Sequence, residues 1–466
     1  QAAEPLDTAR MAALREEGLK RSQVMATLHQ LSDVHSPRLM ASPGYKAAAQ
    51  WAVQQFQAWG ADKAGIEPFP FGHAGWTNER CAVHALEPFK DPLVVEPVAW
   101  TPSTRGAVQG DVARLTVPEE PLPDELDAFL KGQAATVKGK VVFVGTPKPL
   151  PVLPGPARHR HEEAALQKRF DPTQVQGPGR IPSRPGPKRP GALTAREIDQ
   201  RIDAFLVKAG ALARVNDAGL RNGQIRAFNN RTYDLSKAVP TAVMRREDYG
   251  RMWRLMEGGR KARLELDIRN RMHPQLTEGL NVVAELTGTE KPEEVVLLGA
   301  HLDAWHTATG ATDNASNCSV MMEVLRLLKA TGAKPKRTVR IVLFDGEEQG
   351  LLGSQAYVKA HFGMAESPKP AFDKLIAYFN LDSGAGQLRG LSIFGPPEAS
   401  QVLRELLAPF KDLGAVGAIH SAMRLPKPDY ADVTSFSHAG LPAIGVVQDS
   451  LEYGEYTWHT TVDSYE

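Results

Sequence analysis

The chain has 466 residues, with 55 lysines and arginines against 54 aspartates and glutamates, so its formal net charge is +1. This balance offers no electrostatic case for binding nucleic acid or an anionic membrane, and no apolar run reaches the roughly 18–20 residues of a membrane span. The length exceeds one ordinary core and predicts two domains.

The chain starts with Gln1 and two alanines. Such a start indicates a processed chain whose export signal has been removed, so we expect a secreted or periplasmic protein. The two cysteines, Cys81 and Cys318, cannot form a zinc ribbon or a disulfide framework. A single bridge between them would form in an oxidising compartment, but two thiols are the interpretation we favour.

Two helices are predicted near the N-terminus. Apolar residues recur at helical spacing over residues 21–34 and again over 45–59, where Gly60 is a natural stop. Strand-like stretches follow at 81–86 and 93–97. We expect these stretches to begin the sheet of the catalytic domain.

Residues 99–273 carry their own series of strand and helix signals, which predicts a second, smaller α/β unit. This unit would be inserted into a catalytic domain made of residues 1–98 and 274–466. The expected elements of this insert, in chain order, are a strand at 137–144, a helix at 198–212, a strand at 239–243, a helix at 247–257 and a strand at 262–268. Residues 146–190 are rich in proline, glycine and basic side chains, which favours a solvated, mobile loop.

Three short apolar runs in the second half predict buried parallel strands, at residues 295–298, 339–344 and 375–379. The residues that follow these runs are acids and one imidazole: His301 and Asp303, Glu347 and Glu348, and Asp382. Ligand sites in open α/β sheets lie outside the carboxyl ends of the strands. The three runs therefore deliver these side chains to one edge of the sheet.

Five residues form a candidate ligand set for a paired-metal hydrolase: His301, Asp313, Glu348, Asp382 and His459. Two divalent ions about 3.5–4 Å apart can polarise a carbonyl and activate water at neutral pH. Zinc accepts imidazole nitrogen and carboxylate oxygen, and Glu347 is left over as a general base. Singly, the acids have ordinary alternatives, because Glu347 and Glu348 would suit an acidic turn before a helix, and Asp382 a strand-end cap.

Five ordered motifs carry a resemblance to a known family. They are Gly299-Ala-His301-Leu-Asp303, Gly310-Ala-Thr-Asp313-Asn314, Phe344-Asp-Gly-Glu347-Glu348-Gln-Gly350, Asn380-Leu-Asp382-Ser and Trp458-His459-Thr460. The series resembles the zinc-dependent exopeptidases that include leucyl aminopeptidases, glutamate carboxypeptidase and carboxypeptidase Q. Trp305 and the segment Lys334-Pro-Lys-Arg337-Thr338 are most similar to carboxypeptidase Q-like members.

The resemblance implies an α/β fold like that of zinc aminopeptidases and phosphorylases, with a mixed, mostly parallel sheet, helices on both faces and an inserted protease-associated domain. It also implies two Zn²⁺ ions per chain, bridged by Asp313. His301 and Asp382 would complete one site, and Glu348 and His459 the other.

The resemblance extends to residues around the ligands. The carboxylate of Asp303 would hold the imidazole of His301 in one tautomer, and the peptide bond after Asp313 would be cis. Tyr430 resembles a tyrosine that donates to the reacting carbonyl oxygen in some relatives. A packed aromatic before a helix is an equal alternative for Tyr430.

These features predict a dinuclear zinc exopeptidase, of aminopeptidase or dipeptidase type, that hydrolyses bonds near a terminus of small peptides. Two alternatives stay open: a glutaminyl cyclase-like acyltransferase with one zinc, and a non-catalytic binding protein on the same fold. The direction of attack also stays open, because candidate anchors for either terminus exist: Glu452, Glu455, Arg389 and Arg424. Relatives continue past the final motif into a closing helix, and without it a homodimer partner would cover that face of the sheet.

Overall fold

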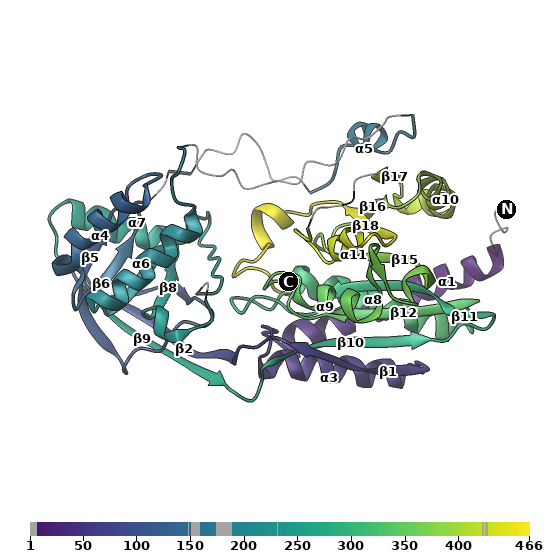
Figure 1. The fold of residues 1–466 in the computed structure, drawn as a ribbon, viewed down its shortest axis with the longest axis horizontal. Coiled ribbons are helices and arrows are strands. Elements are labelled where there is room, and N and C mark those ends of the chain that lie inside the picture. Colours follow the sequence, from purple (N-terminus) through teal and green to yellow (C-terminus); the bar gives the residue numbers. More distant parts are fainter. Residues whose placement is uncertain are drawn as a thin grey trace.

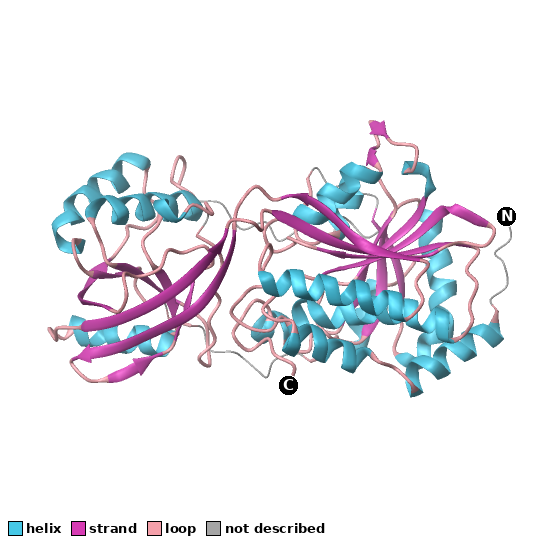
Figure 2. Cartoon of the chain, turned by 90° about the horizontal axis from the view of Figure 1, so that it is seen from below, coloured by secondary structure: helices cyan, strands magenta, loops and turns pink. Residues whose placement is uncertain are grey.

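The computed structural model describes residues 7–147, 149–150, 159–173, 189–230, 232–421, 424 and 427–466. The chain forms two α/β units that lie side by side, each built on its own sheet (Figure 1 and Figure 2). In sequence, the second unit lies between β1 (Lys63–Pro70) and β10 (Glu278–Leu286), which are paired neighbours in the first sheet. Among the described residues, we find no helix that combines the length and the apolar character of a membrane span.

The first sheet has the strand order β1, β10, β12, β11, β15, β18, β16, β17. Its centre is parallel, from β12 through β11 and β15 to β18, and antiparallel pairs flank this centre on both sides. The strand bounds are β11 Lys291–His301, β12 Arg337–Phe344, β15 Leu375–Asn380, β16 Leu388–Phe394, β17 Gly417–Ser421 and β18 Ala443–Gln448. The three predicted apolar runs lie within the central strands, and the expected mixed α/β class is confirmed.

Helices cover both faces of the first sheet. Successive residues of a strand point to opposite faces, so Ile341 and Leu343 of β12 join one core cluster, and Val342 and Phe344 join another. The first cluster packs under α2, α3 and α8, and the second under α9 and α11. The helices of this unit are α1 Thr8–Lys20, α2 Val24–His29, α3 Pro43–Ala58, α8 Ser316–Ala330, α9 Leu352–His361, α10 Pro397–Leu407 and α11 Val433–Ala439.

Local sequence explains where α3 begins and which side it buries. The side chain of Ser42 accepts a hydrogen bond from the N–H of Tyr45 at 3.1 Å, and Pro43 occupies the first turn. The buried side chains recur at helical spacing: Tyr45, Ala48, Ala49, Ala52 and Phe56. The predicted helix at 45–59 is confirmed, and the one at 21–34 is α2 followed by a π-turn, Gln30–Val34.

The second sheet has the strand order β3, β2, β9, β5, β6, β7, β8, β4, with a parallel centre from β5 to β8. Its strands are β2 Gly75–Glu87, β3 Asp91–Leu93, β4 Val95–Pro97, β5 Val108–Leu115, β6 Val141–Val144, β7 Ala213–Asp217, β8 Thr241–Met244 and β9 Arg263–His273. Its helices are α4 Pro123–Val137, α6 Ala195–Ala209 and α7 Arg246–Glu257.

One assignment to the catalytic sheet is wrong. The stretches at 81–86 and 93–97 lie in β2, β3 and β4, which pair in the second sheet. The reason is that β2 runs antiparallel to β9 along its length, and Val83 and Ala85 share a core with residues of β9. Strand periodicity in the sequence does not say which sheet a strand joins.

The proline-, glycine- and base-rich stretch at 146–190 includes residues 148, 151–158 and 174–188, which lie outside the described residues. Residues 159–173, here called the strap, are described and form α5 (Glu163–Arg169), which lies beside β16 and β17 of the first unit (Figure 1). Leu166 and Phe170 of the strap are 1% and 4% exposed. The expectation of a solvated loop is wrong for the strap, because two apolar residues one helical turn apart anchor it despite its polar composition.

Candidate metal centre

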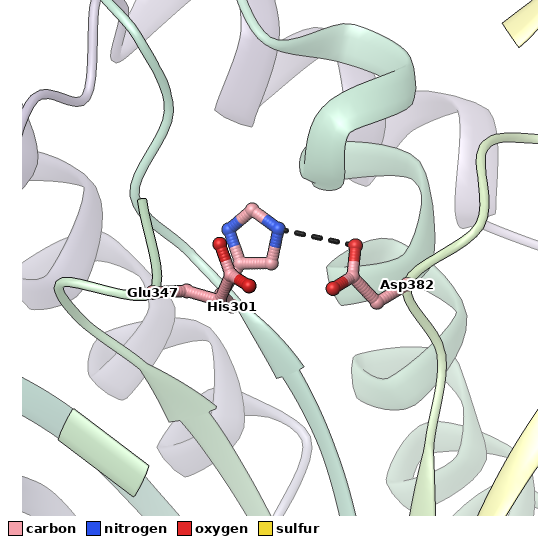
Figure 3. Close-up of side chains that lie close together, drawn as sticks. All are labelled: His301, Glu347 and Asp382. Atoms are coloured by element: carbon pink, nitrogen blue, oxygen red, sulfur yellow. Dashed lines mark hydrogen bonds and ion pairs between the residues drawn. The ribbon is translucent and has the colours of Figure 1, made fainter. Parts of the chain in front are cut away.

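The candidate site lies at the carboxyl edge of the first sheet. His301 is the last residue of β11, Glu347 and Glu348 follow β12, and Asp382 follows β15. Figure 3 shows the side chains of His301, Glu347 and Asp382 pointing toward one another. Asp313 comes from the turn before α8, and His459 from the loop after β18.

Each imidazole faces two carboxylates. Nε2 of His301 lies 3.1 Å from Oδ1 of Asp313 and 3.3 Å from Oδ1 of Asp382. Nε2 of His459 lies 3.1 Å from Oδ2 of Asp313 and 2.9 Å from Oε2 of Glu348. Asp313 therefore presents one carboxylate oxygen to each imidazole, the arrangement that a bridging ligand requires. Donors that bind the same zinc at about 2.0–2.2 Å lie about 3 Å apart, which agrees with these distances.

The donors form two groups. In each group, the ligand atoms lie within 4.8 Å of one another: His301, Glu347 and Asp382 in the first group, and Asp313, Glu348 and His459 in the second. The structure thus brings together all five residues that the sequence suggested as ligands, with Glu347 beside them.

Burial makes this concentration of acids costly without counter-charge. Burial raises the pKa of Glu347 well above its ordinary value; His301 opposes the shift, and Asp382 adds to it. Burial likewise raises the pKa of Glu348 to about 7, against the effect of His459. For His459 burial lowers the pKa, but Glu348 and Asp313 outweigh it and raise the value to about 10. Divalent cations would supply the charge that relieves this arrangement.

Unpartnered polar atoms support the same interpretation. Oε1 of Glu348 and Nδ1 of His459 are buried and form no hydrogen bond among the described residues. Buried polar atoms in folded proteins are nearly always satisfied, so such a group calls for a ligand. Imidazole nitrogen and carboxylate oxygen are the ligand types that zinc accepts, and the donor set fits that metal.

The orientation of His301 depends on a different part of Asp303 from the one expected. Nδ1 of His301 donates to the backbone carbonyl of Asp303 at 2.9 Å, whereas the carboxylate Oδ1 lies 3.5 Å away. A carbonyl only accepts, so this contact places the proton on Nδ1 and leaves Nε2 as the ligand atom. The carboxylate of Asp303 instead accepts the N–H groups of Glu347 and Glu348, each at 3.2 Å. It thereby ties the end of β11 to the acidic turn after β12.

Two residues without an expected role support Asp313. Asp463 accepts the N–H groups of Thr312 at 2.7 Å and Asp313 at 3.1 Å. Arg38 is fully buried and donates to four backbone carbonyls, those of Leu31, Leu302, Thr309 and Gly310, at 2.6–2.9 Å. The bond between Asp313 and Asn314 is cis, as the resemblance implies. Sequence offers no signal for the role of Arg38, since its partners are carbonyls that every residue carries.

The aromatic residues of the site differ from expectation. Tyr430 is 60% exposed, and its role stays a prediction. Tyr453 lies nearer the donors: burial, together with Asp313 and Asp382, raises its pKa well above the ordinary value. Its ring packs on Gly384, where an added Cβ would come within 2.7 Å of Cγ. Only glycine admits the ring there, a dependence that no sequence motif reveals.

The basic anchors considered for a substrate carboxylate are engaged elsewhere. Arg389 is paired with Glu163 at 2.7 Å and with Asp449 at 3.4 Å. Arg424 is paired with Glu366. Both arginines that the sequence suggested as anchors are thus paired with acids. Whether the protein acts at the N-terminus or the C-terminus of a peptide stays open.

The second unit reaches the site through residues 225–228. The ring of Phe228 meets His459 edge-on at 5.5 Å between centroids and also contacts Trp305. The guanidinium of Arg226 lies 4.6 Å above the ring of Trp458 and donates to its carbonyl oxygen at 2.9 Å. Side chains of the second unit thus border the second donor group.

Paired imidazole–carboxylate groups at the carboxyl edge of an open α/β sheet are an arrangement suited to metal-dependent hydrolysis. Residues 281–466 match the model of peptidase family M28. Carboxypeptidase Q from Rattus norvegicus is 32% identical over 215 residues, which are 46% of this chain and 43% of that protein. The matched segment therefore spans less than half the length of this relative.

Solved structures share the fold. A peptidase M28 precursor from Shewanella amazonensis SB2B superposes with a TM-score of 0.67 at 21% identity, covering 98% of this chain and 91% of that one. A zinc aminopeptidase from Bacillus subtilis gives a TM-score of 0.56 at 16% identity, with coverage of 95% and 89%. At these identities the structural comparisons show the fold, and the expected resemblance to zinc-dependent exopeptidases is confirmed by the match of residues 281–466 and by carboxypeptidase Q.

Proposed function

We propose that the protein is a dinuclear zinc exopeptidase that cleaves a bond near one end of small peptides. The observation that carries this proposal is the position of Asp313, whose two carboxylate oxygens each lie 3.1 Å from a different imidazole. The similarity to a carboxypeptidase and to a zinc aminopeptidase supports an exopeptidase and this metal.

In the proposed reaction, bound zinc would polarise the scissile carbonyl. It would also lower the pKa of water, so that the water can lose a proton and attack that carbonyl. Glu347 is the acid beside the five ligands, and it accepts the proton of the attacking water. The same carboxyl then gives the proton to the leaving amine. The carboxylate of Asp303 accepts the backbone N–H of Glu347 and so holds Glu347 in place. The backbone carbonyl of Asp303 accepts Nδ1–H of His301, which keeps Nε2 of His301 directed toward the donors.

We further propose that the second unit is a protease-associated domain that restricts the site to short peptides. Support comes from Phe228 and Arg226, which border His459 and Trp458 and narrow the approach from that side. An export location, a homodimer and a substrate contact for Tyr430 stay predictions.

Metal counting separates the proposal from its nearest rival. Plasma emission spectroscopy on the purified protein should give two zinc ions per chain, because two donor groups are present. One tightly held ion would favour the glutaminyl cyclase-like alternative. Asp313→Asn should lower the count, because that side chain serves both groups.

Peptide digestion tests the reaction itself. A pool of short peptides with free termini, followed by mass spectrometry, should lose residues from one end only. Peptides blocked at that end should survive. Internal cleavage would contradict an exopeptidase, and no cleavage by the protein with both metals bound would favour a binding protein.

A further inference from the structure

The strap belongs in sequence to the second unit but docks on the first. Its two apolar residues, Leu166 and Phe170, are almost fully buried and cluster with Val447 of β18. The Phe170 ring lies directly on the backbone of Gly390 in β16, where any Cβ would overlap it. A linker that merely spans the two units would not bury both side chains against a sheet.

Polar contacts join the strap to the first part of the loop that carries His459, here called the ligand loop (residues 449–461). The carbonyl oxygen of His159 accepts the N–H of Leu451 at 3.0 Å. The N–H of His161 donates to Oδ1 of Asp449 at 2.9 Å. The strap therefore contacts the ligand loop where that loop leaves β18.

The backbone of the ligand loop needs such support. Leu451, Glu452 and His459 have φ values of 37°, 62° and 59°, in the left-handed region that side chains other than glycine rarely adopt. Such conformations persist where the surrounding structure holds them. Two of the three residues lie where the strap binds, and the third supplies a donor of the second group.

The far end of the ligand loop is held by the second unit as well. Ile225 and Thr461 exchange two hydrogen bonds: the N–H of Thr461 donates to the carbonyl of Ile225 at 3.0 Å, and the N–H of Ile225 donates to Oγ1 of Thr461 at 3.1 Å. Arg226 donates to the carbonyl of Trp458, next to His459. Both ends of the ligand loop are thus fixed by chain that lies between β1 and β10.

We propose that the strap and residues 225–228 are positioning elements that hold His459 in the second donor group. The inference rests on the proposed two-metal site. The first group is carried by residues at the ends of β11, β12 and β15, so its geometry does not depend on the strap. Loosening the strap should therefore weaken retention of one metal and leave the other unchanged.

Phe170→Ala tests this inference by metal retention rather than activity. The zinc-loaded protein is exposed to graded chelator and counted by native mass spectrometry. The variant should pass from two metals to one at a chelator concentration about tenfold below that for the unmodified protein, the range seen when residues behind metal ligands are removed. His459→Ala provides the one-metal reference. Hydrogen exchange at the Leu451 amide should also quicken, while exchange in β11 and β12 should not.

Two controls make the test specific. Phe170→Leu keeps most of the apolar anchor and should restore two-metal retention, and Lys168→Ala changes an exposed residue of α5 and should have no effect. Glu163→Gln removes only the ion pair with Arg389 and should shift retention in the same direction by a smaller factor, so a folding defect in Phe170→Ala leaves the inference testable.

The inference is overturned if a folded Phe170→Ala protein, or Glu163→Gln where Phe170→Ala does not fold, retains both metals at the same chelator concentrations as the unmodified chain. Equal loss of both metals would also overturn it. If the unmodified chain binds fewer than two metals, the proposed function fails instead, and the exchange of the Leu451 amide still decides whether the strap holds the loop.

Discussion

Each unit of the molecule buries a group of charged side chains, and the two groups differ in how their acids are partnered. In the second unit, Arg214 is 5% exposed and pairs with Asp199 and Asp203, each at 2.7 Å. In the first unit, four carboxylates surround two imidazoles and leave buried oxygens without hydrogen bonds among the described residues. A buried cluster in which each acid contacts a permanently charged cation serves the fold, whereas one that leaves buried acid oxygens without such a partner calls for a ligand.

Glu347→Gln should give the largest effect, because it removes the proposed proton acceptor and keeps the shape of the site. We expect kcat to fall by ~10²–10⁴-fold while two zinc ions remain bound. Burial disfavours the charged form of Glu347, so the metal-free variant should also melt higher than the metal-free parent at pH 8. Steady-state kinetics, metal analysis and thermal unfolding measure the three quantities.

Glu293→Gln, which changes an exposed acid at the start of β11, is the matched control and should leave all three quantities unchanged. Near-normal turnover by Glu347→Gln would remove the general-base role. A lower melting temperature in the metal-free state would show that the buried acids of the first unit are satisfied by the protein itself.

Arg214→Met tests the paired cluster of the second unit. Removing the cation takes away the ion pairs that Arg214 forms with Asp203 and Asp199, and the free energy of unfolding should fall by about 3 kcal/mol, the low end for breaking a buried pair, because Asp199 is partly hydrated. Urea denaturation followed by the fluorescence of Trp253, which lies in the same unit, measures the loss.

The control for Arg214→Met is Arg201→Met, which breaks an exposed pair with Asp127 in the same unit. Pairs of this kind contribute little, so its unfolding curve should overlay that of the parent. An equal loss in both variants would mean that the burial of Arg214 does not set the energetics of its cluster.

The same contrast explains what the sequence could predict. The edge of the first sheet was predictable because its chemistry restricts residue types: only His, Asp or Glu can serve at 301, 313 or 348, and they follow apolar strands. Arg38 could not be found, because its four acceptors are backbone carbonyls. The burial of Phe170 could not be predicted either, because one apolar residue among many basic residues and prolines barely alters the composition of the segment.

The sheet to which β2 belongs escaped prediction for a related reason. Its alternation of buried and exposed residues fits either sheet, and the choice is made by pairing with β9, about 190 residues away in the chain. Local pattern thus determines that a strand forms, whereas its partner depends on contacts that only the folded chain provides. The candidate metal ligands are less affected by this limit, because histidine, aspartate and glutamate are residue types that bind a metal ion.

Glu96 is expected to give the smallest effect, and it tests a single buried acid that belongs to neither donor group. It lies half-buried on β4, and among the described residues its carboxylate has no ion-pair partner. Burial raises its pKa from 4.5 to about 7. The folded state therefore holds the proton more tightly than the unfolded state, so the contribution of Glu96 to stability is present at low pH and is lost as the pH rises from about 4.5 through 7.

Above pH 7 the ionised Glu96 should cost about 1–2 kcal/mol, less than its shift would imply in full because the side chain is partly exposed. Glu96→Gln should raise the free energy of unfolding by that amount at pH 8 and leave it unchanged near pH 4. Urea denaturation at both pH values measures the difference, with the exposed Glu87→Gln as the control for net charge. A gain that is equal at both pH values would mean that amide packing, rather than the buried charge, is responsible. Added zinc should not change the stabilisation that Glu96→Gln gives at pH 8, because Glu96 lies outside the two donor groups and a bound metal would not neutralise it.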